Sequence, residues 1–270
     1  MKARGCEVGA PPARDNVLPI RSLGLIPEAT LRQASVPTYS GERKPTGLNA
    51  PRLTALAAAR QIESMNKTCP INSIRNVCVY CGSGSGSDPH FIEAAEALGR
   101  SLAEAGIGLV YGGGGEGLMG RVARATLDSG GRVTGIIPSF LIRKEHPLTD
   151  AQELLIVDTM HERKQAMFDR ADAFVALPGG VGTLEELVEQ MTWAALDRHA
   201  KPILIADVDG FWRPLLALFA HMNNKGFIRR GLELRYLVAE KIEDIVPMLR
   251  TAAERNAERA ATAPPVSHKM

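Results

Sequence analysis

The stretch Ala173-Phe-Val-Ala-Leu-Pro-Gly-Gly-Val-Gly-Thr183 runs from apolar residues through a glycine-rich turn. The apolar run at 173–177 is typical of a buried strand, and the segment at 183–196 that follows the glycines predicts a helix. A strand, a short loop and a helix form the repeating unit of parallel α/β sheets. Ligands of such sheets bind beyond the carboxyl ends of the strands. We therefore expect a parallel sheet whose site lies on its strand-to-helix loops.

The same alternation continues over residues 74–250. Helix boundaries are marked locally, because Asp88 and Pro89 favour a first helical turn and Gly106 ends the helix that follows. We expect a Rossmann-like α/β domain, with helices on both faces of a parallel sheet. Strands are predicted at 77–81, 107–111, 132–137, 153–157, 173–177, 202–206 and 236–239, and helices between Pro89 and Gly106 and at 118–129, 161–171, 183–196, 211–225 and 243–254.

The composition excludes several broad classes. The chain has 270 residues, of which 45% are hydrophobic, as in an ordinary globular protein. Its 32 Lys+Arg nearly balance 30 Asp+Glu, which argues against a nucleic-acid-binding protein. No apolar run approaches the ~18 residues of a membrane span, and the first residues lack the apolar core of a secretory signal. We expect a cytoplasmic protein without a nucleic-acid or membrane partner.

The domain organisation follows from a change in charge. Residues 1–70 contain ten Lys+Arg and five Asp+Glu, a net charge of +5, which leaves −3 for the other 200 residues. Prolines interrupt this segment, so we expect residues 1–73 to form a basic, partly disordered extension with one helix at 53–65. A targeting peptide is an alternative for the extension. Residues 74–250 form the single globular domain, and 251–270 a fraying tail.

Two of the four cysteines form a C-x-x-C motif. Cys78 and Cys81 lie in an apolar run that predicts a strand, where side chains three residues apart face opposite sides. Thioredoxin-like cysteines instead open a helix, and a zinc site would need a second ligand pair. We expect inert core thiols and no metal site.

Three loops after predicted strands are rich in glycine. The second, Gly115-Glu-Gly-Leu-Met-Gly120, matches the dinucleotide fingerprint, but the next strand lacks the acidic residue that binds the ribose. An NAD(P)-dependent oxidoreductase is therefore disfavoured, and close backbone approach to a phosphate or ribose is the better interpretation. This places Gly113 and Gly114 among the candidate binding residues. The first loop, 82–87, is either a phosphate contact through Ser83 or a flexible tight turn.

The third loop is the most specific. Gly179 and the glycines that follow it allow backbone N–H groups to point at an anion, and Thr183 can cap the next helix and donate to phosphate. Glu185 and Glu186 are expected in the first turn of that helix. A carboxylate beside a phosphate is costly unless a cation stands between them, so one of the glutamates is expected to take part in chemistry.

The cation is available in Met160-His-Glu-Arg-Lys164. Arg163 can hold a phosphate or a carboxylate through two parallel hydrogen bonds. His161 could act as a base, although a surface or capping histidine is the commoner case.

These motifs together resemble the LOG ("Lonely guy") family of cytokinin-activating phosphoribohydrolases. The resemblance rests on Tyr111-Gly-Gly-Gly-Gly-Glu-Gly-Leu-Met-Gly120, Met160–Lys164 and Pro178-Gly-Gly-Val-Gly-Thr-Leu-Glu-Glu186, with Val79-Tyr-Cys-Gly-Ser83 at the first strand. It implies a Rossmann-like homodimer with sites near the subunit interface. It further implies hydrolysis of the N-glycosidic bond of an N6-prenylated adenosine 5′-monophosphate to the free base and ribose 5-phosphate, without a cofactor. Members often carry the label of lysine decarboxylase, but no lysine here is placed for a Schiff base with pyridoxal phosphate.

The resemblance also implies particular site residues. Arg163 and Glu186 would be catalytic, with Glu186 orienting water and stabilising an oxocarbenium-like state and Arg163 holding the nucleotide and keeping Glu186 ionised. With the glycine loops added, the expected substrate-binding residues are Ser83, Gly113, Gly114, Glu145, Lys164, Gly179, Gly180, Val181, Gly182, Thr183, Leu184, Glu185 and Thr192.

Two alternatives and one specificity question stay open. The chain could be a general AMP nucleosidase, or a non-catalytic nucleotide sensor on the same fold. Met119, Met167 and Trp193 are candidates for a base pocket, although such residues at helical spacing more often belong to the core.

Overall fold

The computed structural model describes residues 74–149 and 151–262. The predictions made for residues 1–73 and 263–270, including the helix at 53–65, lie outside the described residues.

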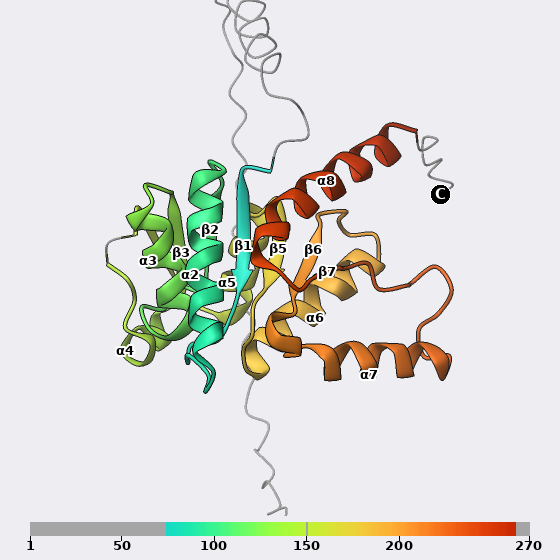
Figure 1. Ribbon diagram of the computed structural model, residues 1–270, viewed down its shortest axis with the longest axis horizontal. Helices are drawn as coiled ribbons and strands as arrows, with labels where there is room; N and C mark the ends of the chain where they lie inside the picture. Colours follow the sequence, from blue (N-terminus) through green and yellow to red (C-terminus); the bar gives the residue numbers. More distant parts are fainter. Residues whose placement is uncertain (1–73, 150, 263–270) are drawn as a thin grey trace, which may run out of the picture. The chain divides into compact units, whose positions relative to one another are not determined.

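The described chain forms a seven-stranded sheet in the order β4-β3-β2-β1-β5-β6-β7, in which every pairing is parallel (Figure 1). The expected parallel sheet is confirmed, with boundaries shifted by at most one residue. The strands are β1 Asn76–Tyr80, β2 Gly108–Tyr111, β3 Val133–Pro138, β4 Glu153–Val157, β5 Ala173–Ala176, β6 Ile203–Ala206 and β7 Leu237–Ala239.

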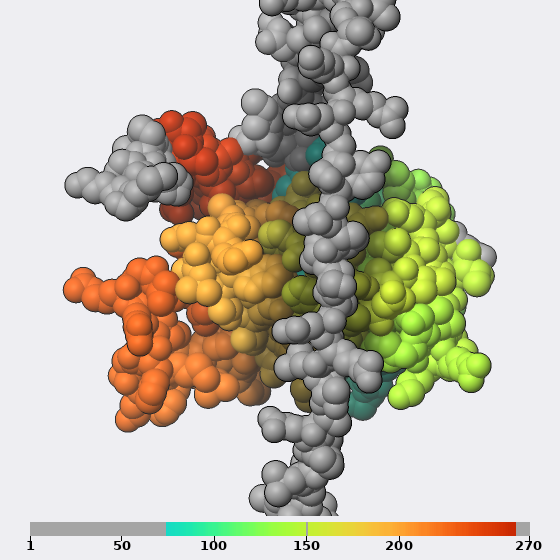
Figure 2. Space-filling view, turned by 180° about the vertical axis from the view of Figure 1, so that it is seen from behind, coloured from blue at the N-terminus to red at the C-terminus, as the bar shows by residue number. Residues whose placement is uncertain are grey.

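Helices cover both faces of this sheet, as predicted. Helices α2, α3 and α8 pack on one face and α5, α6 and α7 on the other. Each of the two groups of helices covers one cluster of buried apolar side chains. Figure 2, seen from behind, shows the gold surface around α6 beside the orange surface of α7. The α-helices are α2 Pro89–Glu104, α3 Gly117–Asp128, α4 Ile142–Glu145, α5 Met160–Arg170, α6 Val181–Ala195, α7 Arg213–Asn224 and α8 Ile245–Thr262, with 3₁₀ turns η1 Ser139–Leu141, η2 Val208–Gly210 and η3 Ile242–Asp244.

Local signals explain where the helices begin. The Asp88 carboxylate accepts from the backbone N–H of His90, and Pro89 occupies the first turn of α2, both as predicted. Helix α5 begins with a capping box, in which Thr159 and Glu162 satisfy each other's backbone N–H groups. This cap fixes the start of the helix that carries Arg163.

Three local predictions are wrong. Helix α6 begins at Val181 with Gly180 as its N-cap, so Thr183 lies inside the helix and does not cap it. Glu185 and Glu186 therefore belong to the second turn, and the first turn holds no acid. Helix α8 continues to Thr262, well beyond the predicted end at 254. The side chain of Asn256 explains this continuation, since its Nδ2 donates to the Ala200 carbonyl at 2.6 Å and docks the helix.

The two described cysteines behave as predicted. Cys78 packs in the cluster under α5 and α6, and Cys81 in the cluster on the opposite face. Both are free thiols. Burial raises the pKa of each well above its ordinary value, so they remain protonated and unreactive.

The strand order fixes where a ligand can bind. The chain reverses direction across the sheet between β1 and β5, and the loops after these two strands leave on opposite faces. The Gly82 N–H donates to the Pro178 carbonyl at 3.1 Å and joins the two loops. Within the described ranges, no helix combines the length and the apolar character that a membrane crossing requires.

Candidate active site

A cavity of about 270 Å³ opens at the carboxyl ends of β1 and β5, where the topology predicts a site. It contains both proposed catalytic side chains and the start of α6. Its lining consists of Val79, Tyr80, Cys81, Gly82, Ser83, Gly112, Met119, Glu145, Arg163, Gly180, Val181, Gly182, Thr183 and Glu186.

The guanidinium of Arg163, which lines the cavity, is held by two backbone carbonyls. Its Nε donates to the Ile136 carbonyl and its Nη2 to the Gly112 carbonyl, each at 3.2 Å. A Cβ at Gly112 would collide with Nη2, so glycine is required there for the guanidinium to reach this position. Because these two donors are engaged by the ends of β2 and β3, Arg163 has fewer groups left for a nucleotide than the sequence suggested. Its Nη1 faces Glu186 instead.

Glu186 is buried beside this guanidinium. Its Oε1 lies 3.5 Å from Arg163 Nη1. Desolvation raises the pKa of Glu186 to about 7, while Arg163 acts in the opposite direction and Glu185 and Glu145 raise it further. The expectation that Arg163 favours the ionised form is correct in sign, but burial outweighs it. Glu186 can therefore exchange a proton near neutral pH.

The start of α6 offers hydrogen-bond donors to the same cavity. The first N–H groups of a helix have no partner within the helix, and no described side chain caps α6. Residues Gly180 to Thr183 line the cavity. A Cβ at Gly179 would collide with Oγ1 of Thr183, so a glycine here allows the loop to fold against the helix start. An anion fits this helix terminus.

The start of α3, in the loop that matches the dinucleotide fingerprint, is arranged differently. The backbone N–H groups of Leu118 and Met119 donate to the Gly82 carbonyl at 3.1 and 3.3 Å. These donors hold the first loop in place and are not free for a phosphate or a ribose. A contact of this loop with a phosphate or a ribose through other groups therefore stays a prediction.

Glu145 reaches the cavity from α4, an element that the sequence did not predict. Its Oε2 is buried and has no hydrogen-bond partner among the described residues. A Cβ at Gly114 would lie 2.9 Å from this oxygen, so the carboxylate rests directly against the second glycine loop. A second hollow of about 230 Å³, lined in part by Ser83, Lys144 and Glu145, continues from this point.

Several predicted binding residues lie away from the cavity. Lys164 Nζ pairs with Glu185 at 2.6 Å and with Glu189 at 2.9 Å, and none of the three is part of the cavity lining. Thr192 is exposed, and its hydroxyl donates to the Val188 carbonyl within α6. The cavity lining also excludes Gly113, Gly114, Gly179 and Leu184.

The candidates for the nucleobase pocket, and the histidine considered as a general base, also lie partly inside and partly outside the cavity lining. Met119 lines the cavity, whereas Met167 is fully buried in the core and Trp193 packs against Phe168. His161 is exposed at the start of α5 and is not part of the lining. The sequence missed Tyr80 and Gly112 as lining residues, although both lie at the carboxyl end of a predicted strand, which is the signal that could have identified them.

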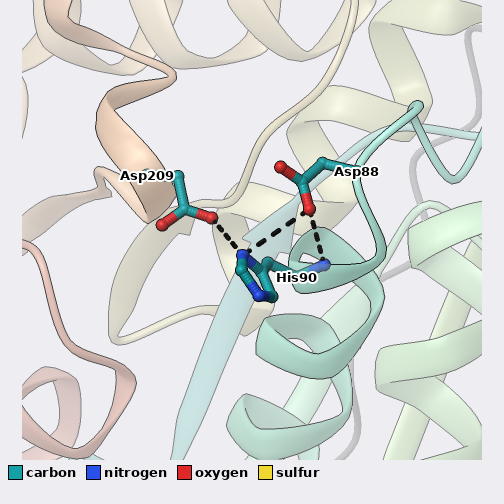
Figure 3. Close-up of side chains that lie close together, drawn as sticks. All are labelled: Asp88, His90 and Asp209. Carbon is teal, nitrogen blue, oxygen red and sulfur yellow. Dashed lines mark hydrogen bonds and ion pairs between the residues drawn. The ribbon is translucent and has the colours of Figure 1, made fainter.

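One group of described residues has the side chains of a metal site. Asp88, His90 and Asp209 approach one another where α2 and η2 meet (Figure 3). His90 Nδ1 lies 2.8 Å from Asp209 Oδ2, and Asp88 already caps α2. These groups bond to each other, join α2 to η2 and lie outside the lining of the 270 Å³ cavity.

The fold and the cavity define a class: a Rossmann-like α/β protein with an anion-binding helix start next to a buried carboxylate–guanidinium pair. Residues 119–249 match a family model described as "Possible lysine decarboxylase". The chain is 49% identical over 172 residues to the cytokinin riboside 5′-monophosphate phosphoribohydrolase LOG of Oryza sativa subsp. japonica, covering 64% of this chain and 71% of the relative. It is 42% identical over 178 residues to the enzyme of the same name from Rhodococcoides fascians, covering 66% and 90%. The chain belongs to the LOG family of phosphoribohydrolases.

Two solved structures share the fold at low identity. The molybdenum cofactor carrier protein of Chlamydomonas reinhardtii superposes with a TM-score of 0.51 at 14% identity, over 67% of this chain and 99% of that one. The molybdenum cofactor binding protein of Rippkaea orientalis gives 0.50 at 20% identity, over 66% and 97%. At these identities the likeness supports the sheet architecture alone.

Proposed function

We propose that this protein hydrolyses the N-glycosidic bond of a cytokinin riboside 5′-monophosphate, an N6-prenylated adenosine 5′-monophosphate, to the free base and ribose 5-phosphate. The observation that carries the proposal is the position of Glu186 and Arg163 in one cavity with the uncapped start of α6. A pure nucleotide sensor would have no need for a buried carboxylate near its phosphate site.

The start of α6 would bind the 5′-phosphate. Its free N–H groups and its partial positive charge both favour an anion, and the Thr183 hydroxyl can add a further donor. Ser83, which lines the cavity from the loop after β1, supplies a second hydroxyl. With the phosphate here, the sugar would extend toward Glu186.

Glu145 is suited to the ribose. Its unpartnered Oε2 needs a hydrogen-bond donor, and the ribose hydroxyls are donors. A ribose held between Glu145 and the phosphate site would present its C1′ atom to the interior of the cavity.

Glu186 would act on water and on the developing charge. As the C1′–N9 bond breaks, its electron pair leaves with the base, and the ribose becomes oxocarbenium-like. Ionised Glu186 stabilises this charge and accepts a proton from the water that attacks C1′. The departing base takes a proton from solvent, and Glu186 then releases its own proton to solvent, so that the cycle balances. Arg163, fixed by two carbonyls, holds the Glu186 carboxylate near this position.

A decarboxylase reading of the family description has little support. No lysine is present in the described lining of the 270 Å³ cavity. Burial lowers the pKa of Lys164, but its hydrogen bonds to the Glu185 and Glu189 carboxylates outweigh burial and raise the pKa above its ordinary value. Its amine is therefore protonated and not nucleophilic.

A homodimer belongs to the same proposal. Val181 borders the cavity and is 82% exposed, and Val188 lies seven residues further along the same side of α6. A second copy that covered this stripe would bury it and shield the cavity. Light scattering tests this. We expect the wild type to be a dimer and Val188→Glu to dimerise more weakly. Leu218→Glu, on exposed α7, is the control, and a monomeric wild type contradicts the proposal.

The reaction is tested by incubating the protein separately with isopentenyladenosine monophosphate and AMP. Free base and ribose 5-phosphate are followed by chromatography, with Glu186→Gln as the control. Faster release from the prenylated nucleotide supports the proposal. Equal or faster release from AMP indicates a general AMP nucleosidase, and binding without release indicates a nucleotide sensor.

A further inference from the structure

Gln190 is a buried amide without partners. It lies on α6 and is 1% exposed, yet neither its Nε2 nor its Oε1 has a hydrogen-bond partner among the described residues. Its buried neighbours on the inner face of the helix, Leu187, Met191 and Ala194, are apolar. An apolar side chain would be the more stable choice here, because an unpaired buried amide is costly. Such a group calls for an explanation.

The helix geometry directs this amide toward the catalytic carboxylate. Gln190 follows Glu186 by four residues, so the two side chains lie on the same face of α6. Helical side chains lean toward the N-terminus of their helix, a direction in which the Gln190 amide can reach the turn that carries Glu186. Both residues are buried, so water does not compete freely for either. The backbone carbonyl of Gln190, unlike its side-chain amide, has a partner, because it accepts from His199 Nε2 at 3.2 Å.

The Glu186 carboxylate has room for another donor. Its contact with Arg163 Nη1 is 3.5 Å long, beyond the usual length of a strong hydrogen bond. The described residues provide no shorter hydrogen bond to it, although a carboxylate can accept about four. An unpartnered donor therefore lies one helical turn from an under-coordinated acceptor.

We propose that Gln190 is a positioning residue, whose Nε2 donates to the Glu186 carboxylate when Glu186 is ionised and so fixes the orientation in which it meets the water and the ribose. This deepens the proposed function, because it assigns the group that aligns the base of that reaction.

Other groups also act on Glu186. The charges of Arg163 and Lys164 on α5 lower its pKa, and those of Glu185 on α6 and Glu145 on α4 raise it. The Glu186 charge in turn raises the pKa of three groups at the end of β1, which are Cys78, Tyr80 and Cys81. A neutral substitution at position 190 leaves all of these charges in place. A change in the titration of Glu186 is then attributable to the amide.

The test compares Gln190→Met, which keeps the length and removes the donor, with Met191→Leu, a buried neighbouring control. The Glu186 carboxyl is titrated by ¹³C NMR, assigned with Glu186→Gln. We expect its midpoint to rise by about one pH unit in Gln190→Met. Such a shift means that the equilibrium has lost about a tenfold preference for the ionised form. The thermal midpoint of unfolding should stay equal or increase, and Met191→Leu should titrate like the wild type.

Turnover gives the second reading. On isopentenyladenosine monophosphate, Gln190→Met should lower kcat roughly tenfold with little change in KM and move the acidic limb of the pH profile upward. An unchanged midpoint of Glu186 in Gln190→Met overturns the positioning role. Because the NMR titration needs no turnover, a shifted midpoint in a protein that hydrolyses no nucleotide would retain the role of Gln190 and reject the proposed function.

Discussion

Arg163 and Glu186 lie 3.5 Å apart, and the residues are only 7% and 8% exposed. Each comes from a different helix, α5 or α6, and the two helices pack on the same face of the sheet. Two opposite charges taken out of water at this distance depend on each other, because removal of either leaves an uncompensated buried charge. The pair therefore links the stability of the site to its chemistry.

The first prediction concerns Arg163. Arg163→Met should lower kcat/KM by roughly 10²-fold or more, because Glu186 loses the buried guanidinium beside it and with it its orientation. The pKa of Glu186 should be higher in this variant, because Arg163 lowers it in the wild type. Arg163→Lys should recover little, because one ammonium cannot replace the two fixed bonds to the Ile136 and Gly112 carbonyls. Steady-state kinetics over a range of pH measure both effects, and wild-type activity in Arg163→Met would exclude this role.

The sequence predicted the sheet more fully than the site. Apolar runs delimited by glycines identify strands and helices locally, and β4 was predicted to the residue. The carboxyl ends of those strands then indicate the region of the cavity. What the sequence could not resolve is which of two adjacent residues faces inward.

Lys164 and Glu185 illustrate this limit. Neighbouring residues on a helix point about 100° apart. Arg163 and Glu186 line the cavity, whereas Lys164 and Glu185 pair with each other and are not part of its lining. The same limit applies to Thr183, whose expected capping role depended on where α6 begins. The N-cap is Gly180 and the helix begins at Val181, whereas the sequence predicted a helix that begins at 183.

The second prediction concerns the pH dependence that Glu186 gives to stability. Its pKa in the folded protein is about 7, above the ordinary value of 4.5. The folded state thus binds the proton more tightly than the unfolded state, and stability falls as the pH rises from the unfolded pKa to the folded one. Glu186→Gln removes this loss. Its unfolding free energy should gain about 3 kcal/mol on the wild type between pH 4.5 and 8.

Denaturant unfolding of both proteins across this pH range measures the difference. Any constant penalty from an unpaired Arg163 lowers the curve of Glu186→Gln by the same amount at every pH, so the difference between the two proteins keeps its trend with pH. Parallel curves would show that Glu186 titrates normally in the folded protein.

The third prediction concerns Gly112. Gly112→Ala should lower kcat/KM by roughly 10²-fold, because its Cβ would occupy the position of Arg163 Nη2 and move the guanidinium. The matched control is Gly84→Ala in the first glycine loop, where a Cβ meets nothing within 4 Å. Kinetics and thermal unfolding of both variants are compared. Equal activity in the two would mean that the guanidinium tolerates displacement.

The fourth prediction concerns Glu145 and the ribose. If its Oε2 accepts from the 2′-hydroxyl, the wild type should hydrolyse 2′-deoxy-AMP at least tenfold less efficiently than AMP. Glu145→Ala should be impaired on AMP but should distinguish the two nucleotides much less. The four kcat/KM values form a double-mutant cycle. A full preference for AMP in Glu145→Ala would assign the 2′-hydroxyl to another residue.

The fifth prediction concerns His90, which joins α2 to η2 (Figure 3). Its pKa is raised, first by the hydrogen bond to Asp209 and then by the charges of Asp209 and Asp88. A raised pKa means that the protonated histidine is favoured in the folded state. The resulting stabilisation is complete below the unfolded pKa of about 6.5 and is lost as the pH rises through the folded pKa.

Asp209→Asn should therefore lower the thermal midpoint at pH 5.5 and have a smaller effect at pH 8.5. Because all three side chains are exposed or partly exposed, the effect should be small and should decrease with salt. An effect that is equal at both pH values would show that Asp209 acts through the left-handed backbone of its turn, where φ is 50°, and not through His90.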